Sequence, residues 1–80
     1  MMLFLLEYDR PRGELISFQK FDDACRQQAA DARLELELSL LRRGIEREVV
    51  ILEAASEEAL RHTHGRYFKS LEELAVVPAA

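Results

Sequence analysis

The side chains best suited to chemistry lie close together near the C-terminal end of the chain. They are the two histidines, His62 and His64, with Arg61, Arg66 and Tyr67 beside them. Imidazole can bind a metal ion or transfer protons, and guanidinium and phenol groups can hold an anionic or polar ligand. A ligand-binding or catalytic site in this chain is therefore expected at Arg61, His64, Arg66 and Tyr67.

The two histidines do not predict a metal site. On a helix, positions i and i+2 diverge by about 200°, so His62 and His64 do not readily bind one ion. Glu58 or the single cysteine, Cys25, would complete a set of ligands only by a chance arrangement. Cys25 has no CxxC partner, and a lone cysteine is more often a small buried residue than a nucleophile. We expect no metal, no cofactor and no assigned catalytic residue, which makes an enzyme the less favoured class.

Charge and hydropathy narrow the classes of partner. The chain has 80 residues, a formal net charge of −4 and 32% charged residues. Binding to phosphate backbones depends on clustered positive charge, and the basic turn at residues 10–13 is flanked by Asp9 and Glu14. The apolar runs are far shorter than the roughly 18 residues of a membrane span, and residues 1–6 are too short for a secretory signal. We expect a cytoplasmic protein with no nucleic-acid and no membrane partner.

Three short apolar segments predict strands. Residues 2–8 are almost continuously apolar, which is typical of a strand buried on both faces, and residues 14–21 alternate as in a strand with one wet face. Pro11 and Gly13 between them suit a hairpin loop. Residues 48–54 are rich in β-branched side chains and predict a third strand.

The remaining segments predict two helices. Residues 24–43 contain neither Gly nor Pro, follow two aspartates that could cap a helix, and end at Gly44, a common helix C-cap. Their alternating part, Leu34 to Leu40, would suggest a strand only if its helix-favouring flanks were ignored. Ser56 is a natural N-cap for a second helix over residues 57–74. Gly65 within it costs about 1 kcal/mol relative to Ala and marks a kink or a close contact.

This order of elements predicts a single α+β domain of ββαβα topology over residues 1–75, followed by a flexible tail at residues 76–80. A right-handed crossover makes the third strand parallel to the second. The first strand has the most continuous apolar run and fits the centre, which gives a three-stranded mixed sheet of order 2-1-3 with both helices packed on one face. An order with the third strand in the middle stays open, because residues 49–52 are equally apolar.

The first helix carries two apolar stripes on nearly opposite sides. A helix that is apolar on two sides is packed on both, so one stripe covers the sheet and the other meets the second helix or another subunit. We expect the interface at Ala29, Ala32, Leu36 and Leu40 of the second stripe. The first stripe consists of Ala30, Leu34, Leu38, Leu41 and Ile45, and the second of Cys25, Ala29, Ala32, Leu36 and Leu40.

One segment resembles a known family. Residues 49–55 followed by residues 56–64 resemble the strand-then-helix segment of small bacterial ferredoxin-like proteins of the dimeric α+β barrel type, some of them linked to nickel response. His64 matches a helix histidine of that family. This chain opens with a hairpin and has no further histidines of the family's kind, so a nickel role is not carried over. The resemblance implies a dimeric, ferredoxin-like arrangement.

Two functions from different classes follow. The second apolar stripe, a small core and an apolar edge strand favour a protein–protein interaction module that acts as a homodimer or docks to another protein. The alternative is a small ligand-binding or enzymatic domain that uses the helix face of His64 and Tyr67. A concave pocket at His64 would favour this second function.

Overall fold

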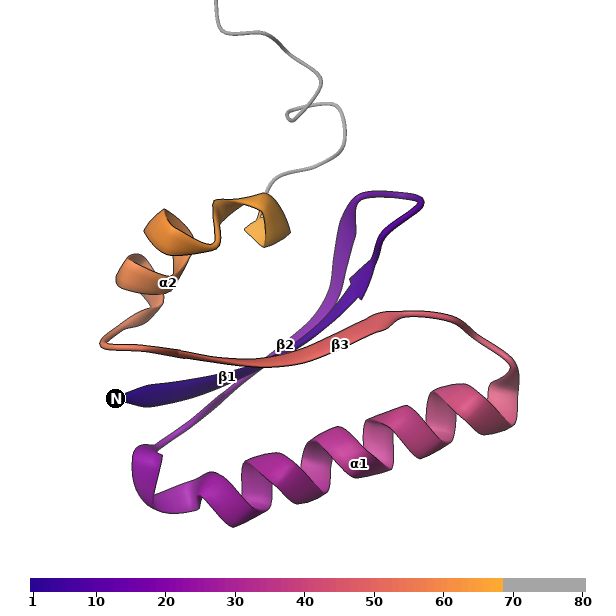
Figure 1. Cartoon of the computed structure of the whole chain (residues 1–80), viewed down its shortest axis with the longest axis horizontal. Helices are drawn as coiled ribbons and strands as arrows, with labels where there is room; N and C mark the ends of the chain where they lie inside the picture. The colour runs from indigo at the N-terminus through magenta and orange to yellow at the C-terminus, as the bar shows by residue number, and fades with distance from the viewer. Residues whose placement is uncertain (69–80) are drawn as a thin grey trace, which may run out of the picture.

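A three-stranded sheet carries a helix on each side, α1 beneath the strands in Figure 1 and α2 above them. The computed structural model describes residues 1–68. The elements in chain order are β1 (Met2–Asp9), β2 (Glu14–Phe21), the 3₁₀ helix η1 (Asp23–Cys25), α1 (Arg26–Arg43), β3 (Glu48–Ala54), α2 (Glu57–Thr63) and the 3₁₀ helix η2 (Gly65–Phe68).

The sheet has β1 in its centre, with the strand order β2-β1-β3. The predicted α+β class and the order 2-1-3 are thus confirmed, and β3 does not lie in the middle. β1 is antiparallel to both neighbours, so β2 and β3 run in the same direction, as expected, but do not touch. The sheet is therefore antiparallel throughout rather than mixed. β1 takes the centre because residues 3–8 are all buried, which only a strand flanked on both edges can achieve.

Alternate residues of β1 point to opposite faces of the sheet. Phe4, Leu6 and Tyr8 belong to a buried cluster that includes Leu60 of α2 and Tyr67 of η2. We call this side the α2 face. Aromatic contacts hold it together, because the Phe4 ring stacks on Phe18 with 5.6 Å between centroids and the Tyr8 ring meets Tyr67 edge-on at 5.0 Å.

The other side of β1 faces α1, and we call it the α1 face. Leu3 and Leu5 are 3% exposed, and Leu5 shares a groove with Ala32 and Leu36 of α1. The structure thus corrects the prediction that both helices pack on one face. The physical reason is that β1 is apolar on both sides, so each face of the sheet needs its own cover.

The second stripe of α1 is the one that covers the sheet. Ala29 and Leu40 are buried at 1% and 4% exposure, and Ala32 and Leu36 are half-buried. These four residues were the expected interface, and the structure corrects that assignment, because their partner is the sheet of the same chain.

Two of the three helix caps predicted from the sequence are present in the structure. Gly44 ends α1 in the left-handed region at φ 67°, and its N–H donates to the carbonyls of Leu40 and Leu41. Ser56 caps α2, and its hydroxyl accepts from the Ala59 N–H at 3.1 Å. The predicted aspartate cap of the first helix is wrong in detail, since Asp22 makes no side-chain cap and a 3₁₀ turn precedes α1.

The second helix is shorter than the pattern predicts. α2 ends at Thr63, His64 is its C-cap, and the chain continues from Gly65 as a 3₁₀ turn. The break at Gly65 agrees with the predicted kink. The rest of the predicted helix, the domain boundary at residue 75 and the predicted tail at residues 76–80 lie outside the described residues.

The two glycines beside the helices make a matched test of backbone conformation. A Cβ at Gly44 or at Gly65 would meet no heavy atom within 4 Å, but only Gly44 has a positive φ. We expect Gly44→Ala to lower the free energy of unfolding by about 1 kcal/mol, because an L side chain is strained in the left-handed region. Gly65→Ala should be neutral or stabilise by up to about 1 kcal/mol. Urea denaturation of both variants checks this, and equal losses would contradict it.

Candidate functional site

The most exposed apolar surface of a described helix lies on the first stripe of α1. Leu34, Leu38 and Leu41 are 58%, 43% and 77% exposed, and Ala30 is also exposed. We call these four residues the outer face of α1. They recur every three or four positions, so they form one line along the side of the helix that points away from the sheet. A solvent-facing helix side is normally polar, so a line of exposed leucines is a candidate interaction surface.

Charged residues border the outer face on both sides. Arg33 and Glu37 lie on one border and pair with each other at 2.8 Å. Asp31 and Arg42 lie on the other, where Asp31 accepts from the Gln27 amide at 2.9 Å. Among residues 1–68, Arg42 has no carboxylate at ion-pair distance. An apolar line with a charged border has the make-up of a protein interface.

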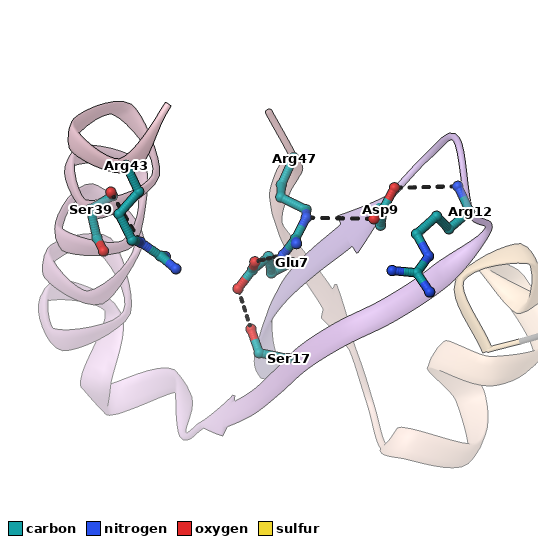
Figure 2. A network of polar contacts seen from close by, with 7 residues as sticks. All are labelled: Glu7, Asp9, Arg12, Ser17, Ser39, Arg43 and Arg47. Atoms are coloured by element: carbon teal, nitrogen blue, oxygen red, sulfur yellow. Dashed lines mark hydrogen bonds and ion pairs between the residues drawn. The ribbon is translucent and has the colours of Figure 1, made fainter. Parts of the chain in front are cut away.

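A cluster of polar groups lies on the α1 face of the sheet, beside α1 in Figure 2. Glu7 of β1 is buried at 6% exposure. Its carboxylate binds the guanidinium of Arg47, from the loop before β3, and accepts from the Ser17 hydroxyl at 3.2 Å. Arg47 also approaches Asp9 at 3.7 Å. Within the described part of the chain, no buried side-chain nitrogen or oxygen lacks a partner.

This Glu7–Arg47 cluster is suited to holding the fold rather than to catalysis. Its carboxylate is buried and neutralised by a guanidinium at Oε2, and it accepts from a hydroxyl at Oε1, so both oxygens are engaged within the fold. It ties the loop before β3 to the central strand. The sequence patterns did not predict this cluster. Glu7 was a sequence signal for it, because this residue is a single charge inside the apolar run of β1.

The ligand site expected from the sequence lies on the α2 side of the molecule. The structure brings Arg66 and Tyr67 together, since the guanidinium donates to the Tyr67 hydroxyl at 2.7 Å and pairs with Glu48 at 3.3 Å. Tyr67 itself is 5% exposed. His64, the C-cap of α2, is half-buried.

Arg61 points to other partners. It pairs with Glu57 at 3.1 Å, and its guanidinium lies over the Phe68 ring at 4.3 Å from the centroid. Burial raises the pKa of the Tyr67 hydroxyl, and hydrogen bonding to Glu48 raises this pKa further. The phenol therefore stays neutral around pH 7 and is not activated as a base or nucleophile.

The surface of residues 1–68 carries shallow grooves, and the linings of three of them come from other parts of the chain. The first lies between the end of α1 and β3, at Leu41, Ile45 and Val49. The second lies beside the hairpin turn at Pro11, and the third lies between α1 and β2 at Leu36. None of these three linings contains Arg61, His64, Arg66 or Tyr67.

Two further findings concern ligands and membranes. Among the described residues, no group of three or more His, Cys, Asp or Glu side chains is placed to hold a metal ion. No helix in residues 1–68 has the length and apolar character needed to cross a bilayer.

No family model, curated protein or solved structure matches this chain. The resemblance of residues 49–64 to the dimeric ferredoxin-like family therefore stays a prediction.

Removing the cation of the buried Glu7–Arg47 pair should cost more stability than removing the cation of an exposed pair. We expect Arg47→Met to lower the free energy of unfolding by about 2–3 kcal/mol, because it leaves the Glu7 carboxylate buried without its cation. Arg12→Met is the matched control, since Arg12 is 70% exposed and lies 3.8 Å from Glu14. It should change stability by less than about 0.5 kcal/mol. Chemical denaturation measures both, and similar small losses would show that the buried pair does not stabilise the fold.

Proposed function

We propose that this protein is a protein–protein interaction module that works as a homodimer through the outer face of α1. The observation that carries the proposal is the exposure of Leu34, Leu38 and Leu41, at 58%, 43% and 77%, along one side of the longest helix in the described chain. The second stripe already has the sheet as its partner, so the outer face is the side of α1 left for another molecule.

The energetics favour association of this kind. Complete burial of a leucine side chain contributes about 1.5–3 kcal/mol, and a symmetric pair buries each leucine twice. A chain of 80 residues also has a small core of its own, because a domain of this size buries only about 60% of its unfolded surface. One helix pairing with its copy forms an interface at the low end of the usual size range, so we expect association near micromolar concentration.

The geometry gives less support to a ligand-binding or enzymatic domain at His64 and Tyr67. Tyr67 is buried with its hydroxyl bound to Arg66, and Arg61 is engaged by Glu57 and Phe68. These contacts use the groups that a ligand would need. A cytoplasmic location belongs to the proposal and rests on the single cysteine, which gives no internal disulfide.

Substitutions of two neighbouring leucines of α1 distinguish an interface residue from a core residue. We expect Leu41→Glu to raise the dissociation constant at least about 10-fold while the monomer keeps its fold, because this side chain is exposed in the single chain. Leu40→Glu is the contrasting variant, since Leu40 is only 4% exposed. It should unfold the domain, because it buries an unpaired charge against the sheet.

Sedimentation equilibrium and circular dichroism melts on wild type and both variants provide the measurement. A wild-type chain that stays monomeric up to about 100 μM would overturn the proposal, because an interface of this size should assemble there. Dissociation by Leu41→Glu with an unchanged far-UV spectrum would support it.

A further inference from the structure

Charge is distributed unevenly along α1. Asp22 and Asp23 lie just before the helix, and Asp31 lies in its N-terminal half. Arg42 and Arg43 form its last turn. All five side chains are exposed. Two cations, Arg26 and Arg33, also lie in the N-terminal half, and they pair with Asp23 at 2.7 Å and with Glu37 at 2.8 Å. Among residues 1–68, Asp22 and Asp31 have no ion-pair partner.

This inference rests on the homodimer proposed above and concerns how its two copies are arranged. We propose that the two α1 helices pack antiparallel, with Asp31 of each copy beside Arg42 of the other. An antiparallel pair places the acidic end of one helix next to the basic end of its partner. A parallel pair would instead place Arg42 and Arg43 beside the same two arginines, and such like-charge contacts disfavour association.

The apolar side chains agree with the same register. When Asp31 lies opposite Arg42, the midpoint of the pair falls between residues 36 and 37. Leu34 then lies opposite position 39 of the other copy, one residue from Leu38, and the small Ala30 lies opposite position 43, two residues or about 3 Å from Leu41, the most exposed of the three leucines at 77%. Every residue of the outer face therefore gains an apolar neighbour, and small side chains meet large ones, as close helix packing requires.

The two-fold symmetry of the proposed dimer creates the Asp31–Arg42 contact twice. Asp31 and Arg42 are eleven positions apart on one helix, which corresponds to about 16 Å along its axis. The two equivalent Asp31–Arg42 contacts thus lie at opposite ends of the interface, with the leucine contacts between them. A single substitution alters both contacts at once because the dimer has two-fold symmetry.

Charge reversal tests the arrangement in the full chain. We expect Asp31→Arg alone and Arg42→Glu alone each to raise the dissociation constant about 10-fold, because two attractive contacts become repulsive. The double variant should return to within about 3-fold of wild type, since the contacts are restored with reversed polarity. Arg12→Glu makes the same change of net charge as Arg42→Glu on the hairpin turn, away from α1, and should have little effect. Sedimentation equilibrium at low ionic strength gives the dissociation constants of wild type and of the four variants.

Cross-linking gives an independent measure of direction. In a Cys25→Ala background, chains with Leu34→Cys are mixed with chains with Leu38→Cys and oxidised. The antiparallel pair should form the mixed 34–38 disulfide in preference to either same-residue disulfide. Preference for same-residue disulfides, or failure of the double charge variant to recover, would overturn the antiparallel arrangement. If Leu41→Glu still dissociates the protein in that case, the homodimer itself stands, whereas a monomeric wild type removes both.

Discussion

The burial of β1 on both of its faces is the constraint on which the rest of the structure depends. Its residues 3–8 are all buried, and both of its edges are paired. The neighbouring strands cover only the edges of the central strand, so each of its two faces needs a helix to shield it from water. α1 covers one face on its way from β2 to β3, and α2 with η2 covers the other (Figure 1).

Because α1 alone covers one face of the sheet, that face contains a buried charge and leaves one side of α1 uncovered within residues 1–68. Glu7 lies among the buried residues there, and Arg47 from the loop before β3 neutralises it (Figure 2). α1 contacts the sheet through small residues, Ala29 and Ala32, and through Leu36 and Leu40. Its remaining leucines have no element of the described chain to cover them. The exposed face that we propose for assembly is thus the far side of the helix that shields β1.

Short-range signals predicted much of the local structure. Ser56 and Gly44 mark helix ends because a hydroxyl can accept an orphan N–H and glycine tolerates a positive φ. The hairpin and the three strands follow from the length and period of apolar runs, which also favoured β1 for the centre of the sheet. The Asp22 cap failed because the chain enters α1 through a 3₁₀ turn, a detail that residue types alone do not specify.

By itself, then, the sequence determined the elements and their order along the chain, because these depend on neighbours along the chain, and it favoured β1 over β3 as the central strand without deciding between them. Only the tertiary structure decided which face each helix covers and which stripe of α1 meets the sheet. Both stripes have helical period, so periodicity cannot choose between them, and the choice depends on how closely side chains fit the sheet. The pairing of Glu7 with Arg47, 40 positions apart, was likewise decided only when the chain folded.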